Sequence, residues 1–294
     1  MVTRTEKNSL SGKVIGRYQV LSEIGRGAPL PETVYPQAKQ AALKALEIDD
    51  QLADAHVSLG LIKERWDWDF AGAEAEYKRA IELDPKYAEG PHRYGVFLAA
   101  MGLFDEAVAQ LAHARALDPL SIVIVSDQAR PYFLSRRHDR AIEILRQALE
   151  MDPNFIRARL NLALEYARMG KYDEALTEEK KAFEMTGGPI REDGTRRIND
   201  ILAVIYAQAG RKAEALKIIA DMDEQEKQGR YTYPFIRAGV YAGLGDKEQA
   251  FKWLEKAYAA RSPGMVDMRG ALLFDKIRDD PRFADLMRRV GLPQ

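Results

Sequence analysis

The chain contains no cysteine, which excludes disulfides, thiolate metal sites and a cysteine nucleophile. It also lacks a surplus of charge of either sign, because 44 Lys and Arg residues balance 45 Asp and Glu residues to a net charge of −1. A strong overall field that would attract nucleic acid is therefore missing. We expect no nucleic-acid partner.

Long apolar runs are missing as well. The opening residues MVTRTEKNSLSGKV are polar and lack the apolar stretch of a signal peptide. A charge interrupts every later run before it approaches the roughly 18 apolar residues of a membrane span. We therefore expect a soluble, cytoplasmic protein without membrane contact. With 46% hydrophobic and 30% charged residues in 294, the chain is suited to two domains or one repeat array.

The main positive signal is an internal repeat. Asp-Pro pairs begin at Asp84, Asp118 and Asp152, each 34 residues after the last. A second marker keeps the same period, since a motif ending in alanine recurs with steps of 34, 34, 40 and 35 residues. Its positions are Ala107, Ala141, Ala175, Ala215 and Ala250. Two independent markers with one period indicate a repeated structural unit.

Each period has the pattern of two amphipathic helices, with apolar or small residues recurring every three or four positions. Glycines fall between the two halves, where a left-handed residue ends the first helix and lets the chain reverse. These are Gly102, Gly170, Gly210 and Gly245. The alanines lie early in the second helix, where a small side chain lets the helices approach, and proline ends that helix. Each unit is predicted to be a helical hairpin.

This pattern resembles the tetratricopeptide repeat family over residues 36 to 262. The motif positions of the first helices are Leu59-Gly60, Tyr94-Gly95, Leu162-Ala163-Tyr166, Leu202-Ala203-Tyr206 and Ala238-Tyr241. The resemblance implies an all-α fold, a right-handed α-solenoid of helix-turn-helix repeats. Such a fold is shared by proteins of many functions.

Three departures from the family pattern stand out, and the last of them divides the repeats into two blocks. The segment RWDWDF at 65–70 replaces a glycine turn, Pro131 is expected to kink or shorten a first helix, and the segment at 186–195 lengthens one step. We expect an N-terminal remnant at 1–31, an opening half repeat at 32–52, a first repeat block at 53–187, a linker at 188–195, a second block at 196–262 and capping helices at 263–294. The apolar side of the capping helices is expected to seal the end of the solenoid.

Residues 14–27, VIGRYQVLSEIGRG, resemble the first strand and glycine-rich loop of bacterial serine/threonine protein kinases, some of which carry tetratricopeptide arrays. The pattern breaks at Ala28-Pro29-Leu30, and the sequence has no catalytic lysine strand, His-Arg-Asp loop or Asp-Phe-Gly motif. Phosphoryl transfer needs these parts together. We interpret the segment as a kinase remnant, mobile or loosely attached, and expect no enzymatic activity.

Other candidate sites have a structural explanation. The four histidines, His56, His92, His113 and His138, contain no i, i+4 pair and are interpreted as repeat residues rather than metal ligands. The three tryptophans are interpreted as packing residues rather than a base-stacking platform. We expect no catalytic residue, metal or cofactor.

The remaining candidate is a groove. In the family that the sequence resembles, the first helix of each unit lines a concave side that binds peptides or partner helices. The residues expected to face this groove are Arg130, Phe133, Arg157, Asn161, Leu164, Arg168, Arg197 and Asp200. Arginines beside apolar side chains suit an acidic, partly hydrophobic peptide, because a guanidinium group binds a carboxylate with two hydrogen bonds.

The sequence therefore predicts a non-catalytic scaffold that binds a protein or peptide partner in the concave groove. Two alternatives stay open. One is a regulatory array derived from or associated with a bacterial serine/threonine kinase signalling protein. The other is a structural array that associates with itself.

Overall fold

The structure, a computed structural model, describes residues 31–185, 200–229 and 232–293. The kinase-like segment at 14–27, the linker at 188–195 and Arg197 lie outside these ranges. Every regular element within them is a helix. The elements are α2 (Pro31–Ile48), α3 (Ala53–Ile62), the π-helix η1 (Lys63–Asp67), α4 (Phe70–Leu83), α5 (Glu89–Met101), α6 (Phe104–Leu117), α7 (Ile122–Asp127), α8 (Arg130–Leu134), α9 (His138–Met151), α10 (Ile156–Arg168), α11 (Tyr172–Met185), α12 (Asp200–Gln208), α13 (Lys212–Lys227), α14 (Pro234–Gly243), α15 (Lys247–Ala259), the 3-10 helices η2 (Pro263–Gly270) and η3 (Leu272–Ile277), and α16 (Pro281–Val290).

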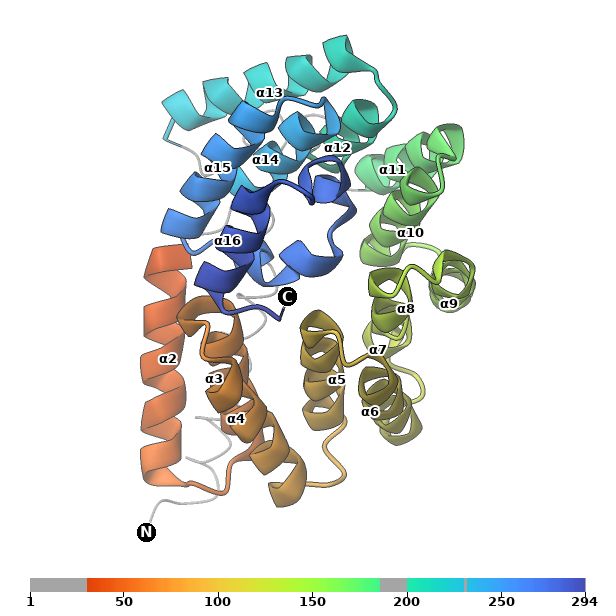
Figure 1. The fold of residues 1–294 in the computed structure, drawn as a ribbon. Coiled ribbons are helices and arrows are strands. Elements are labelled where there is room, and N and C mark those ends of the chain that lie inside the picture. The colour runs from red at the N-terminus through yellow and green to blue at the C-terminus, as the bar shows by residue number, and fades with distance from the viewer. Residues whose placement is uncertain (1–30, 186–199, 230–231, 294) are drawn as a thin grey trace.

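Consecutive helices pack as hairpins, and the hairpins follow one another in an arc (Figure 1). The pairs α3 with α4, α5 with α6, α10 with α11 and α14 with α15 make the most extensive helix contacts. The prediction of an all-α solenoid of helical hairpins is confirmed. Glycines Gly102, Gly170, Gly210 and Gly245 all have the left-handed backbone that ends a first helix.

Small residues bring the two helices of a hairpin together. The alanines at the repeat positions of the second helices are fully buried, and these are Ala73, Ala107, Ala141, Ala175, Ala215 and Ala250. On the facing helix α5, a Cβ at Gly95 would lie 2.7 Å from Cγ of Leu111 and 3.1 Å from the carbonyl oxygen of Ala107. Only a residue without a side chain fits there, because the opposing atoms include backbone.

Proline divides one of the first helices, as expected. The chain forms the short helices α7 and α8 where other units have one longer helix, and Pro131 lies in the first turn of α8. Proline is accommodated there because the first turn has no intrahelical partner for its missing N–H.

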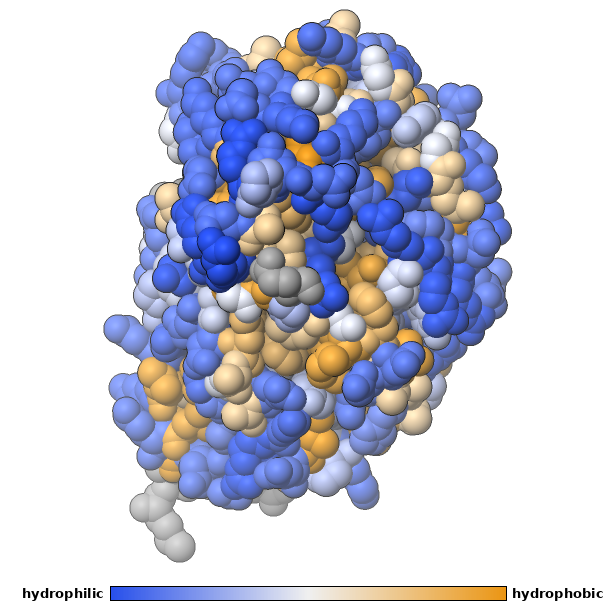
Figure 2. Space-filling view, in the orientation of Figure 1, coloured by the Kyte–Doolittle hydropathy of each residue, from blue (hydrophilic) through white to orange (hydrophobic). Residues whose placement is uncertain are grey.

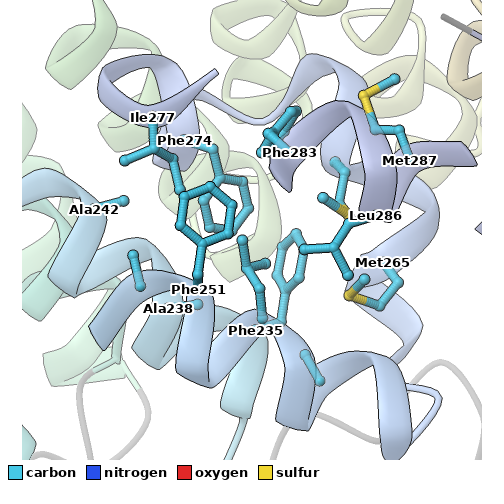
Figure 3. Packing of buried hydrophobic residues seen from close by; sticks show 14 of the residues in the cluster. Phe235, Ala238, Ala242, Phe251, Met265, Phe274, Ile277, Phe283, Leu286 and Met287 are labelled. Carbon is cyan, nitrogen blue, oxygen red and sulfur yellow. The ribbon is translucent and has the colours of Figure 1, made fainter. Parts of the chain in front are cut away.

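After α15 the chain turns back into the arc (Figure 1). Helix α16 packs on α15, while η2 contacts α5, α8 and η1, and η3 contacts α14. Side chains of all three C-terminal helices join those of α14 and α15 in one apolar cluster, in which the ring of Phe274 lies between Phe235 and Phe283 (Figure 3). The apolar side expected for residues 263–294 is therefore buried.

Two of the C-terminal helices, η2 and η3, extend away from the end of the array, while α16 packs on α15. Helices η2 and η3 lie along the inner side of the arc rather than across its open end. Glycines allow this close approach, since a Cβ at Gly264 would meet the Phe235 ring at 2.5 Å and one at Gly270 would meet Cδ2 of Leu134 at 1.9 Å.

The two ends of the arc meet. The ring of Trp68, which follows η1, lies 5.1 Å from the ring of Tyr258 at the end of α15. Arg261 donates a 2.6 Å hydrogen bond from Nη1 to the carbonyl oxygen of Trp66 and lies over the Trp68 ring. The aromatic segment that replaces a glycine turn in the sequence thus joins the first full hairpin to the last.

Candidate partner-binding surface on the inner face

Residues 263–278, called the inner segment here, occupy part of the face on which the groove was expected. Asp267 of this segment lies between two arginines of the repeats. Arg65 contacts Asp267 Oδ2 from Nη1 at 3.0 Å, and Arg130 forms a short hydrogen bond to Oδ1. Burial alone would raise the pKa of Asp267, but Arg130 and Arg65 outweigh it and hold the pKa below its ordinary value.

The same network extends into the repeats and is balanced in charge. Arg65 also contacts Glu64 at 2.9 Å, and the hydroxyl of Tyr77 donates to Glu64 at 2.8 Å. Two arginines, Arg65 and Arg130, are thus compensated by two carboxylates, Glu64 and Asp267. This balance allows Glu64 to be buried and the other three charges to be partly buried between η1, α8 and η2.

Further arginines hold the backbone of the inner segment. Arg168 donates to the carbonyl oxygens of Phe133 at 3.2 Å and of Gly270 at 3.5 Å. Arg269 donates from Nη1 to the carbonyl oxygen of Met101 at 2.9 Å. The inner segment is therefore fixed to the ends of α5, α8 and α10 by directional bonds as well as by apolar burial.

The structure brings three of the eight expected groove residues together. Arg130 and Arg168 both lie over the ring of Phe133, at 5.9 and 5.0 Å from its centre. All three residues face the inner segment rather than an empty groove, because each arginine bonds to it. Sequence patterns placed these residues on the inner face but did not reveal what covers them.

The other expected residues are dispersed. Arg157 pairs with Asp127 at 3.2 Å, and Leu164 packs against the apolar cluster of α12 and α13. Asn161 is half-buried on α10, and Asp200 is the first residue of α12, where burial raises the pKa of its carboxyl group. Arg197 lies outside the described residues. A single continuous site is therefore formed by Arg130, Phe133 and Arg168 alone among the described members of the set.

Two adjoining cavities lie between the repeats and the inner segment. One of about 150 Å³, called the apolar pocket after its apolar side chains Ala99, Ala100, Phe104 and Leu134, is also lined by the charged Asp267 and Arg269 and by Gly270. The other of about 80 Å³, called the basic pocket, is lined by Phe133, Leu134, Arg136, His138, Arg168, Arg269, Gly270, Leu272, Asp275 and Arg278. They share Leu134, Arg269 and Gly270. In Figure 2, apolar side chains gather in a hollow on this face, over the end of α5.

Sequence reasoning missed the inner-segment residues Asp267, Arg269 and Arg278, because they lie after the last repeat and follow no period. It also missed Arg136, although a signal was present. Arg136 stands 34 residues from both Gly102 and Gly170, at the position of the turn glycine. An arginine at a turn position that is glycine in neighbouring units indicates that its side chain makes a specific contact.

Two histidines pair with carboxylates, His56 with Glu76 at 2.6 Å and, in the basic pocket, His138 with Glu165 at 2.9 Å. Within the ranges that the structure describes, no group of three or more acidic or histidine residues is arranged to hold a metal ion. In the same ranges, no helix combines the length and apolar character that crossing a bilayer requires.

The arc of hairpins with a lined inner face defines an α-solenoid repeat protein. The sequence model of the tetratricopeptide repeat family matches residues 68–123 and 132–178. The chain therefore carries tetratricopeptide repeats in these two stretches. This agrees with the 34-residue period and with the hairpins from α4 to α11.

Matches to curated proteins cover only part of each relative. The chain is 28% identical over 162 residues to protein O-mannosyl-transferase TMTC3 of Homo sapiens, covering 52% of this chain and 17% of that protein. It is 36% identical over 78 residues to the type IV pilus assembly protein PilF of Pseudomonas aeruginosa, covering 26% of this chain and 31% of that protein. The chain thus spans less than a third of either relative.

Among solved structures, a tetratricopeptide repeat protein from Parabacteroides merdae is similar with a TM-score of 0.54. The two are 14% identical, and the match covers 96% of this chain and 99% of the other. At this identity the similarity shows the shared helical-repeat fold.

Proposed function

We propose that the chain is a non-catalytic scaffold that binds an acidic, partly apolar peptide segment of a partner protein. The observation that carries the proposal is the pair of adjoining pockets between the repeats and the inner segment, one with four apolar side chains in a mixed lining and one basic. Helical-repeat arrays present extended inner surfaces to peptides, which supports this assignment. The name of PilF, an assembly protein, is also in keeping with a role in protein assemblies.

The inner segment restricts where a peptide can bind. Five of its apolar side chains are almost fully buried, namely Met265, Val266, Met268, Phe274 and Ile277. At about 1.5–3 kcal/mol each, their exposure would cost roughly 7–15 kcal/mol. A peptide with a dissociation constant of 1 μM gains only about 8 kcal/mol. Displacing the inner segment would cost as much as this binding gains or more, so we propose that the peptide binds beside the inner segment.

The two pockets match the proposed ligand in size and charge. A cavity of about 150 Å³ in an engineered protein core holds a benzene ring, so the apolar pocket has room for one aromatic or aliphatic side chain. The arginines of the adjoining basic pocket would bind an acidic group a few residues away. Recognition would combine apolar burial with charge complementarity and involve no chemical step.

Site-specific photo-crosslinking in the native cell tests the proposal. A photoreactive residue replacing Phe104, in the wall of the apolar pocket, is expected to give a discrete adduct with one partner protein. The matched control replaces Leu120, which is 84% exposed in a loop after α6 and lines neither pocket. Adducts at both positions alike, or at neither, would contradict the proposal.

The kinase-associated alternative depends on residues 14–27, which lie outside the described ranges. Calorimetry of the full chain with magnesium ATP tests it directly. Binding would favour a regulatory array with a nucleotide-binding segment, whereas no heat of binding would leave the kinase resemblance without a biochemical counterpart.

A further inference from the structure

The basic pocket contains more positive charge than the surrounding carboxylates compensate. Four arginines line it, namely Arg136, Arg168, Arg269 and Arg278. Among the described residues, two carboxylates pair with these guanidinium groups. Asp275 pairs with Arg136 at 3.2 Å and Arg278 at 3.0 Å, and Glu165 pairs with Arg168 at 3.2 Å. The pocket therefore has a surplus of two positive charges.

Glu165 is also shared with a fifth basic side chain. His138, which lines the pocket, lies 2.9 Å from Glu165 through Nδ1. The neighbouring network around Asp267 differs, because its two arginines have two carboxylates. The same face thus contains one cluster in which positive and negative charges balance and one in which positive charge is in excess.

Backbone carbonyls hold the arginines of the basic pocket without neutralising them. Arg278 donates to the carbonyl oxygens of Arg269 at 2.6 Å and Ala271 at 3.1 Å. Among the described residues, the one hydrogen bond of the Arg269 side chain is to the Met101 carbonyl oxygen. These bonds fix the guanidinium groups in place before any ligand arrives, which reduces the entropy lost on binding.

Arg168 lacks a hydrogen-bond acceptor for one of its donors. Its Nε is buried and has no partner among the described residues. Burial lowers the pKa of Arg168, and the nearby charges of Arg136 and Arg278 lower it further against the opposing effect of Glu165 and Asp275. A bound anion would relieve this repulsion and accept hydrogen bonds from the guanidinium groups around it.

We propose that the basic pocket binds a phosphate dianion, either free or as a phosphate monoester. A dianion matches the surplus of two charges, whereas a single carboxylate would neutralise half of it. The cavity of about 80 Å³ is too small for a large ligand and suits a compact oxyanion. Arginine binds phosphate oxygens through pairs of N–H groups, so several arginines around one pocket favour this chemistry. Where the monoester belongs to a partner peptide, the proposal rests on the function proposed above.

Calorimetry with inorganic phosphate on the full chain at pH 8 tests the proposal, with sodium acetate at matched ionic strength as the reference anion. We expect one phosphate per chain and no measurable acetate binding. Arg136→Gly and Arg278→Gln are expected to weaken phosphate binding at least tenfold. Arg140→Gln is the matched control, because Arg140 is an exposed arginine of α9 that pairs with Glu143 outside the pocket.

The variant Arg136→Gly keeps the test decisive if Arg278→Gln fails to fold. It introduces the residue that other units have at the same turn, and Arg136 itself is exposed. Phosphate binding no stronger than acetate binding, or unchanged phosphate affinity in Arg136→Gly, would overturn the proposal.

A second titration distinguishes the two sources of phosphate. Blocked phosphoserine, N-acetylated and amidated, is compared with inorganic phosphate and tested for competition with it. Tighter, competitive binding of phosphoserine identifies a phosphorylated side chain as the ligand, and weaker binding identifies free phosphate. Binding of neither overturns the proposal. Failure of the peptide-binding function would appear separately, as a missing crosslink at position 104 with phosphate binding intact.

Discussion

At the scale of single residues, His92 shows how one repeat helix is tied to the next. It is fully buried on α5, with Nε2 at 2.8 Å from Asp127 and Nδ1 at 3.1 Å from Glu89. Burial alone would lower the pKa of His92, but the two carboxylates outweigh it and raise the pKa to about 9. The charged imidazolium is therefore the stable form in the folded protein at neutral pH.

This raised pKa predicts a loss of stability with rising pH. Because the folded pKa exceeds the ordinary value of 6.5, the stabilisation is complete below about pH 6.5 and is lost as the pH approaches 9. We expect the free energy of unfolding to fall by up to about 3 kcal/mol over this range, measured by urea denaturation. His92→Gln should flatten this dependence, while His113→Gln, at an exposed position of α6, should keep it. Equal pH dependence in the wild type and His92→Gln would contradict the assignment.

At the scale of elements, the turn between the two helices of a hairpin is the most informative. Positions 68, 102, 136 and 170 are spaced by the repeat length and all have a positive φ, with values of 58°, 83°, 62° and 73°. Glycine occupies two of them, but Trp68 and Arg136 occupy the others. For a residue with a Cβ this backbone costs about 1 kcal/mol. In both cases the side chain contacts the C-terminal part of the chain, Trp68 at Tyr258 and Arg136 at Asp275.

Replacing each of these two residues by glycine should have opposite effects. Arg136→Gly removes an exposed side chain whose ion pair contributes little, so the stability is expected to stay the same or rise by up to about 1 kcal/mol. Trp68→Gly removes the ring contacts with Tyr258 and Arg261 and should cost about 2–4 kcal/mol despite the relieved backbone. Chemical denaturation of both variants measures the difference. Similar stability changes in the two variants would show that the ring contacts of Trp68 do not stabilise the fold.

At the scale of the whole molecule, the C-terminal helices change an open array into a closed arc. Trp68, Phe70 and Met101 of the first hairpins pack against the same apolar cluster as α14, α15 and α16. In a simple solenoid each unit contacts only its neighbours, and stability is roughly a sum over units. Here contacts between units far apart in the sequence also contribute to the free energy of unfolding. We therefore infer that the first and last hairpins unfold together.

Removal of residues 279–294 tests this cooperation. It deletes α16 with its buried side chains Phe283, Leu286, Met287 and Val290, a loss of roughly 6–12 kcal/mol of apolar burial. That loss is comparable to the total stability of a typical domain, so we expect a lower melting temperature or aggregation. Circular dichroism and light scattering provide the measurements. Removal of residues 293–294 alone is the control, and a monomeric 279–294 deletion with unchanged melting would refute the role of α16.

Part of the candidate surface could be predicted because repeat positions have fixed orientations. The family resemblance led to the expectation that Arg130, Phe133 and Arg168 face the groove, and in the structure both arginines lie over the Phe133 ring. Their actual partners, Asp267 and Gly270, lie about a hundred residues or more further along the chain. Nothing in a local pattern specifies such a pairing, because it depends on where the arc brings the two segments.

By itself, the sequence determined the helical hairpins, their period, the alanine contacts between paired helices and the break at Pro131. These features depend on local periodicity, on small residues at fixed spacing and on backbone preferences, all of which act within one unit. The tertiary structure alone decided that the arc closes, that the inner segment covers part of the inner face and that four arginines surround one pocket. Those outcomes depend on the accumulated curvature of successive hairpins, a property of the whole chain that no single unit encodes.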